Sequence, residues 1–385
     1  MDEKAIQPIL LTLLRAALNG EPLAPATAQG LNKEVLGSLY RLAKKHDLSH
    51  VISEILYQNR IEVEEGLRLR LQQQHYASVC RCEQMKYAQA QIYAAFAEAQ
   101  IHYVPLKGAI LRKFYPVDSM RTSCDIDILI HEKDLDRAVE ELKKNGFRCG
   151  ERHYHDVSLF APNGIHLELH FTIQENRKNL DAILKKVWQY VTPTEETYQY
   201  AFTDEFFVFH MFAHMAYHFT RGGCGIRSLM DLWVMNHNMR LSYTKAETML
   251  KKAGIYQFAQ EMSRITEQAF TDGKTDEFSD TVLRYILSGG VYGSVKNHMA
   301  VKKTQANNTF GYALRRLFLP LDGMKSLYPV LKKAPILLPF CWIGRWFGML
   351  FGGKLGNAVT ELSRSHAIPE SQMREIKVIF SRLDL

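Results

Sequence analysis

The sequence lacks the features that define several classes of protein. Its six cysteines are scattered, and their spacing matches neither a zinc-binding pattern nor a disulfide framework. Free thiols are typical of a reducing compartment, so we expect a cytoplasmic protein. The first residues are acidic where a signal peptide would be basic, which predicts an amphipathic helix instead. The uncharged run 334–344 has 11 residues and two prolines, whereas a membrane-spanning helix needs roughly 20 apolar residues.

Acidic residues are almost absent from one segment, residues 310–356. It contains seven Lys or Arg residues and a single acid, Asp322, so it carries +6 of the chain's net charge of +7. Many aromatic residues accompany this charge. Three interpretations are open: the segment packs on the helical part of the chain, docks on an anionic membrane surface, or holds a nucleic-acid backbone. We favour packing over membrane contact, because two prolines interrupt the apolar run and no long amphipathic helix is evident.

Helical patterns dominate the chain except in one region. Residues 1–100 predict an N-terminal helical region, and residues 101–195 predict an α/β core in which short strands flank one amphipathic helix. Helical spacing returns in residues 196–309, and residues 310–385 form a basic, aromatic helical tail. This order predicts an α+β protein with a small mixed β-sheet core flanked by N- and C-terminal helical regions.

The stretch Cys124–Ile130 is a predicted strand that carries two acids. Residues two apart on a strand point to the same side, so Asp125 and Asp127 share one face. The isoleucines that alternate with them share the other face and can enter the core. Two adjacent carboxylates repel each other, so we expect a positive group between them. A solvated strand face is the alternative.

A third carboxylate lies on another predicted strand, in the sequence GIHLELHF, where Glu168 alternates with Leu167 and Leu169. If the two strands are neighbours, Glu168 converges with Asp125 and Asp127. Oxygen ligands of this kind bind Mg²⁺ together with substrate phosphates, so Mg²⁺ is the expected cofactor and Mn²⁺ its alternative. Two such ions can assist an in-line displacement at phosphorus.

The sequence VPLKG precedes the acidic strand by 17 residues, counted from Gly108 to Asp125. A glycine after a strand lets a phosphate approach the backbone N–H groups closely. Lys107 adds a positive charge, and Arg121 offers a guanidinium suited to phosphate. Lys107, Gly108 and Arg121 are therefore the predicted nucleotide-binding residues. The alternatives are a surface lysine at 107 and a structural ion pair at Arg121.

Taken together, these residues resemble the polymerase-β-type nucleotidyltransferase superfamily. More narrowly, they resemble a poorly characterised bacterial nucleotidyltransferase family with the pattern LKG…R…DIDLLV…ELH. The matching residues are Leu106–Gly108, Arg121, Asp125–Ile130 and Glu168–His170. The resemblance covers about residues 103–171 well and extends weakly to GIRSLMDLWVM, residues 225–235, whose helix would close the site. It implies metal ligands and catalytic residues at Asp125, Asp127 and Glu168, and a phosphate-binding turn at Gly108.

One departure from the pattern concerns the residue after the motif glycine. The superfamily usually has Ser or a second Gly there, whereas this chain has Ala109. The resemblance implies an enzyme that moves a nucleoside monophosphate from an NTP to an acceptor hydroxyl and releases pyrophosphate. The acceptor, a small molecule, a protein side chain or an RNA end, is not identified. The alternative is a degenerate member that binds a nucleotide or a partner without turnover.

Several histidines accompany these motifs. His166 and His170 flank Glu168 on its face of the strand, and they either orient a carboxylate or the acceptor, or form local hydrogen bonds. His210, His214 and His218 are spaced i, i+4 and i+8, and three residues so placed on one straight helix cannot complete a single tetrahedral zinc site. We expect the latter three to pack, with exposure to the cleft as the alternative. Downstream, Arg227 and Asp231 are expected to pair at i, i+4.

Overall fold

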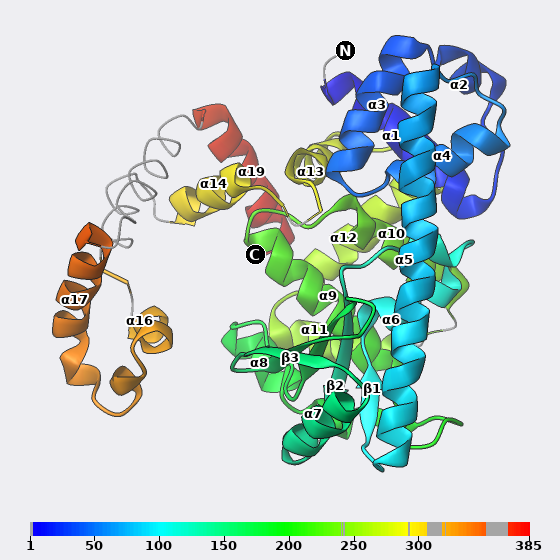
Figure 1. Ribbon diagram of the computed structural model, residues 1–385. Helices are drawn as coiled ribbons and strands as arrows, with labels where there is room; N and C mark the ends of the chain where they lie inside the picture. The colour runs from blue at the N-terminus through cyan, green and yellow to red at the C-terminus, as the bar shows by residue number, and fades with distance from the viewer. Residues whose placement is uncertain are drawn as a thin grey trace.

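A computed structural model describes residues 3–351, except 240, 242, 292, 306–317 and 320, and residues 369–385. Figure 1 shows helices around a small sheet, and a separate pair of short strands forms a second, two-stranded sheet, so the predicted α+β class is confirmed. The N-terminal elements are α1 (Glu3–Asn19), α2 (Pro25–Gly30), α3 (Lys33–Lys45), α4 (Ser49–Gln58) and α5 (Glu65–Glu98). Asn32 begins α3, because its side-chain oxygen accepts a hydrogen bond from the Val35 N–H at 3.1 Å.

The sheet is mixed, as expected, and has five strands in the order β1-β2-β5-β4-β3. Their bounds are β1 (Tyr103–Pro105), β2 (Asp125–Ile130), β3 (Arg148–Arg152), β4 (Asp156–Phe160) and β5 (His166–His170). β2 and β5 are parallel, and the other pairs are antiparallel. Of these five strands, only β3 was not predicted from the sequence, because it is an exposed edge strand of mostly polar residues.

Short helical segments separate β1 from β2: α6 (Lys107–Leu111), η1 (Arg112–Phe114) and η2 (Asp118–Met120). β1 therefore ends earlier than the sequence suggests, and Gly108 lies in the first turn of a helix rather than directly after a strand. η3 (Glu132–Asp134) and α7 (Leu135–Lys144) follow β2. α7 ends at Asn145-Gly146, and Gly146 has a φ of +83°, which a glycine adopts without strain.

The two faces of the sheet belong to two different cores. Ile126, Ile128 and Ile130 pack with Leu167 and Leu169 in a core that also takes in the C-terminal half of α5 and one face of α7. Figure 1 shows α5 running as one long helix beside the sheet. The expected alternation of β2 is thus confirmed, because its isoleucines are buried on this side while its two acids are partly exposed on the other.

Helices from both ends of the chain form the other core, together with Leu129 of β2. After β5 come α8 (Lys178–Leu184), η4 (Val187–Gln189), β6 (Val191–Pro193), β7 (Tyr200–Phe202), α9 (Asp204–Thr220) and α10 (Ile226–Asn238). Next are α11 (Thr244–Ala253), α12 (Tyr256–Phe270), α13 (Glu277–Gly289) and α14 (Val295–Gln305). The last are α16 (Leu321–Leu327), η5 (Pro329–Lys332), η6 (Pro335–Leu337), α17 (Leu338–Phe351) and α19 (Glu370–Leu383). None of the described helices combines the length and apolarity needed to cross a membrane.

Candidate active site

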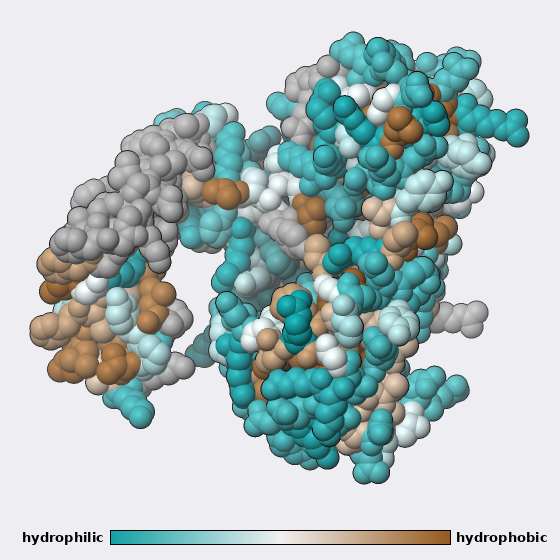
Figure 2. Space-filling view, in the orientation of Figure 1, coloured by the Kyte–Doolittle hydropathy of each residue, from teal (hydrophilic) through white to brown (hydrophobic). Residues whose placement is uncertain are grey.

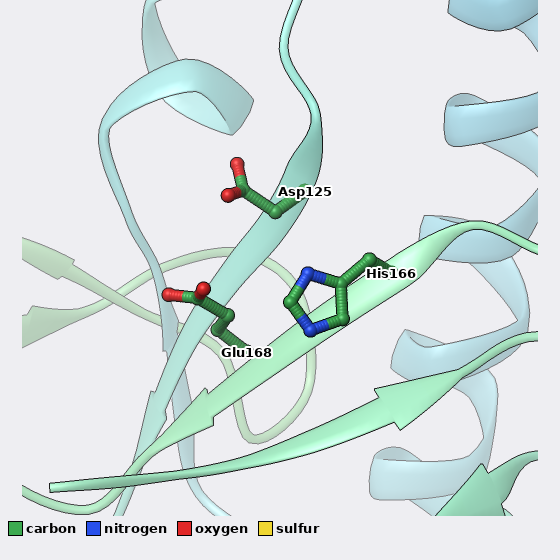
Figure 3. Close-up of side chains that lie close together, drawn as sticks. All are labelled: Asp125, His166 and Glu168. Atoms are coloured by element: carbon green, nitrogen blue, oxygen red, sulfur yellow. The ribbon is translucent and has the colours of Figure 1, made fainter. Parts of the chain in front are cut away.

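Three acidic side chains meet on the face of the sheet opposite α5 and α7. In the parallel pair β2 and β5, Asp127 lies beside Glu168, and Asp125 lies beside His166. Figure 3 shows Asp125 on one strand and Glu168 and His166 on its neighbour, and one ligand atom of each lies within 4.8 Å of the others.

A second cluster consists of Asp127, Glu168 and His170, whose ligand atoms also lie within 4.8 Å of one another. Glu168 therefore belongs to both clusters. Within the described part of the chain, no other cluster of three or more His, Cys, Asp or Glu side chains is spaced for a metal ion. The three predicted ligands are therefore brought together by the fold, as two overlapping groups joined through Glu168.

His170 is the positive group between the carboxylates. Its Nε2 lies 3.0 Å from Asp127 Oδ1 and 3.5 Å from Glu168 Oε2. Burial alone would lower the pKa of His170, but its hydrogen bonds to the two carboxylates outweigh burial and raise the pKa to about 9. His170 is therefore an imidazolium at neutral pH, and one strand supplies both a carboxylate and its counter-charge.

The carboxylates differ in how well they are compensated. Burial, followed by repulsion from Asp127 and Glu168, raises the pKa of Asp125 to about 6. Asp127 is also buried, which opposes ionisation, but Lys107 and the hydrogen bond from His170 hold its pKa well below the usual range. The hydrogen bond with His170 also lowers the pKa of Glu168. Asp125 is thus the carboxylate whose charge is least stabilised by the protein itself.

The turn at residues 106–108 is attached to this cluster. The Leu106 N–H donates to the carbonyl oxygen of Asp127 at 3.0 Å. Lys107 has a φ of +35°, in the left-handed region that is strained for a lysine. Its ammonium lowers the pKa of Asp127 and opposes part of the rise in the pKa of Asp125. The Ala109 N–H donates to the Leu106 carbonyl at 3.1 Å, so this donor is already used inside the turn.

Arg121 forms the structural ion pair that was the alternative to phosphate contact. Its Nη2 lies 2.9 Å from Asp231 Oδ2 and its Nε lies 3.2 Å from Oδ1. The Tyr115 hydroxyl donates to the same carboxylate at 2.6 Å. The third nitrogen, Nη1, lies against Gly108: a Cβ there would be 2.7 Å from it. A side chain at position 108 would therefore force the Arg121 guanidinium to shift.

The expected pairing of Arg227 with Asp231 is wrong. Arg227 Nη2 instead lies 2.9 Å from Asp47 Oδ2 and 2.9 Å from the Thr122 hydroxyl. Asp231 turns toward Arg121, 110 residues earlier in the chain, because that pair is buried and satisfies both carboxylate oxygens. The i, i+4 spacing on α10 made the local pair possible, but the tertiary contact is better compensated.

The histidine stripe of α9 lies toward the acidic cluster. His214 Nδ1 lies 3.0 Å from Glu175 Oε1. Burial, with Lys107 next, lowers the pKa of His214 far below its usual value, while the charge of Asp127 opposes this shift. Burial also raises the pKa of Glu175 and lowers that of His218 to about 3. These histidines are thus neutral, half-buried groups beside the site, and they do not form a zinc site in the described structure.

Two of these residues were not identified as site residues from the sequence. Glu175 lies in the loop after β5 and belongs to no motif, so no sequence signal could have found it. His170 was considered only as an orienting group, although it is the last residue of the ELH triplet. Its two-residue spacing from Glu168 places both on one face of β5 and was the available signal.

A mixed sheet with carboxylates on two neighbouring strands, flanked by helices, is the arrangement expected for a nucleotidyltransferase. The model of a family described as uncharacterised nucleotidyltransferase matches residues 33–271, from α3 to the end of α12. The match spans more than half of the chain, and the protein belongs to this family. No curated protein and no solved structure matches the chain significantly. The family supports nucleotidyl transfer as the general activity and an NTP as the general substrate.

Proposed function

We propose that the protein is a metal-dependent enzyme that transfers a nucleoside monophosphate from an NTP to an acceptor hydroxyl. The observation that carries this proposal is the meeting of Asp125, Asp127 and Glu168 on one face of two neighbouring strands. A purely structural sheet face would gain nothing from three buried or half-buried carboxylates, because their mutual repulsion raises the free energy of the folded state.

The donor set suits a hard divalent cation. Carboxylate oxygens are the ligands that Mg²⁺ and Mn²⁺ prefer, and Asp125 in particular has a pKa raised by burial and by its acidic neighbours. Asp125, Asp127 and Glu168 would hold the cation. When bound, it would neutralise these carboxylates and the triphosphate, and stabilise the charge that develops at the α-phosphate.

Two side chains of the site are assigned to the two substrates: Lys107 to the NTP and Glu168 to the acceptor hydroxyl. Lys107 lies close enough to Asp127 to lower its pKa, so its ammonium is placed to neutralise a triphosphate held at the same carboxylates. Besides helping to hold the cation, Glu168 accepts the proton of the acceptor hydroxyl. A bond forms between the acceptor oxygen and the α-phosphorus. The bond between that phosphorus and the oxygen bridging the α- and β-phosphates breaks, and pyrophosphate leaves.

Arg121 has a positioning role in this proposal. Two of its nitrogens are bonded to Asp231, and the third lies against Gly108, so the guanidinium fixes the position of the turn beside the site. This pair joins α10 to the sheet region, and His214 places α9 beside it. We propose that the helical region 196–309 closes the site through these two helices.

The test is product formation by the full-length protein. Each of the four NTPs, labelled at the α-phosphate, is incubated with the protein, Mg²⁺ and cell extract, and labelled macromolecules and small molecules are separated. We expect a labelled product from the wild type and a loss of about a thousandfold or more in Asp125→Asn. Asp136→Asn is the matched control, because Asp136 has a 91% exposed side chain outside the site.

Two outcomes of this experiment would contradict different parts of the proposal. If the wild type labels nothing but binds an NTP in the presence of Mg²⁺, the protein is a degenerate nucleotide-binding member and the catalytic proposal is wrong. If Asp125→Asn retains full activity, the carboxylate cluster is not the catalytic site. Far-UV circular dichroism of each variant checks that the fold is retained.

A further inference from the structure

The C-terminal helices α16 and α17 form a small unit outside the part of the chain that matches the family. Phe318 contacts Trp342 and Trp346, with ring centroids 5.2 and 5.1 Å apart, and the Trp342 Nε1–H donates to the Leu319 carbonyl at 2.9 Å. Met324 and Leu331 are fully buried, at 0% exposure each. One face of α17 is therefore already occupied by its own neighbours.

The opposite face of this unit carries exposed apolar side chains, which we call the apolar stripe. They are Ile336, Phe340, Ile343 and Phe347, with exposed fractions of 84%, 69%, 46% and 55%. Phe340, Ile343 and Phe347 follow one another on α17 at intervals of three and four residues, which places them along one side of that helix, and Ile336 lies in η6 directly before it. Figure 2 shows hydrophobic surface gathered over the region that α16 and α17 occupy in Figure 1.

α17 is too short to bury this stripe by spanning a membrane. α17 has 14 residues, which correspond to about 21 Å at 1.5 Å per residue, whereas the hydrocarbon core of a bilayer is about 30 Å thick. A short helix with an apolar face lies in the plane of a membrane surface and inserts that face among the lipids. α17 has no acidic residue to oppose such insertion.

The charge of the surrounding segment indicates which surface fits. Residues 310–356 contain seven basic residues and one acid, and the exposed Lys333 lies three residues before Ile336. A second copy of the chain would bring the same +6 charge against itself, whereas an anionic lipid surface attracts it. Charge complementarity therefore favours a membrane over self-association. The basic residues Arg315, Arg316 and Lys354 and the aromatic residues Phe310 and Tyr312 lie outside the described residues.

We propose that the apolar stripe docks on an anionic phospholipid bilayer, with the exposed Lys333 facing the lipid headgroups. This differs from the packing expected from the sequence, because packing on the chain would bury the aromatic side chains, whereas Phe340 is 69% exposed. Docking would hold the enzyme site at a membrane surface. The inference does not depend on the proposed catalytic activity.

The test is flotation of the full-length protein with vesicles of phosphatidylcholine alone or of phosphatidylcholine with phosphatidylglycerol. We expect flotation with the anionic vesicles only, and less of it at high salt, because exposed charges are screened over about 10 Å at 0.1 M. Phe340→Ser/Ile343→Ser should weaken binding about tenfold or more. Val378→Ser is the matched control, because Val378 is an exposed residue of α19, at 60%.

A charge variant tests the proposal even if the double variant fails to fold. Lys333→Glu leaves the apolar stripe intact and should reduce flotation with anionic vesicles several-fold, an effect that high salt removes. Wild-type protein that does not float with anionic vesicles, or that floats equally with neutral ones, would overturn the proposal. Light scattering provides a further check: a wild-type dimer that becomes a monomer in the double variant would show that a second copy covers the stripe.

Discussion

Two groups of charged side chains lie beside the turn at residues 106–108, and they are built in opposite ways. Arg121, Asp231 and Tyr115 form a compact set in which each carboxylate oxygen receives a hydrogen bond. In the second group, the imidazolium of His170 contacts Asp127 and Glu168, whereas Asp125 lies close to Glu168 and His166. The first set stabilises the fold, because its charges are opposite and paired. The second leaves negative charge uncompensated, which is useful only if a cation arrives with the substrate.

The largest change in stability should come from breaking the compensated set. Arg121→Ala leaves the Asp231 carboxylate buried without its partner, at 7% side-chain exposure. We expect the free energy of unfolding to fall by about 3–5 kcal/mol, measured by urea titration of the full-length protein. Arg152→Ala is the control, because its ion pair with Asp136 is exposed, and the expected loss is about 0.5 kcal/mol or less.

An equal and small loss in both variants would show that the buried pair contributes no more than a surface pair. It would also remove the basis for assigning Arg121 a positioning role beside Gly108. Arg121→Lys sharpens the test, because an ammonium keeps the charge but cannot reproduce the two hydrogen bonds of the guanidinium.

Removing a charge from the group of Asp125, Asp127 and Glu168 should instead raise the free energy of unfolding. Because the pKa of Asp125 is raised from its model-compound value of 3.8 to about 6, the folded state holds a proton that the unfolded state has lost between those pH values. Wild-type stability therefore falls as the pH rises through this window. Asp125→Asn removes the titration and should stabilise the metal-free protein by about 1–3 kcal/mol at pH 8 but not at pH 3.5.

The measurement is thermal or urea unfolding of both proteins across this pH range in the presence of a chelator. Asp136→Asn should show no comparable dependence on pH. If Asp125→Asn is instead less stable than the wild type at pH 8, the carboxylate is structural and the contrast between the two sets fails. Saturating Mg²⁺ should reduce the advantage of the variant, because the cation stabilises only the intact cluster.

The smallest of these effects should be that of Lys107→Ala. The charge of Lys107 lowers the pKa of Asp127, so we expect its ammonium to attract the triphosphate as well. Its loss should weaken NTP binding about tenfold, measured by isothermal titration in the presence of Mg²⁺. Lys113→Ala is the matched control, because Lys113 is exposed on the neighbouring η1 segment. Unchanged NTP affinity in Lys107→Ala would show that the lysine balances the carboxylates only.

The sequence by itself determined the local pattern of the site. A strand period of two puts Asp125 and Asp127 on one face and the isoleucines on the other, and it does the same for Glu168 and His170 on β5. The helices α9 and α10 were also predictable, because their long apolar patterns extend over several turns. These features depend only on residues close together in the chain, so no knowledge of the packing was required.

The tertiary structure alone decided which distant groups meet. The parallel pairing of β2 with β5 brings Glu168 to Asp127, and Arg121 selects Asp231 across 110 residues, although Arg227 was the nearer partner in sequence. Likewise, the sequence shows an uncharged apolar run at residues 334–344, but only packing shows that Trp342 is turned inward and Phe340 outward. Periodicity fixes the face on which a side chain lies, whereas its partner depends on which surfaces are buried together, and that is a property of the whole fold.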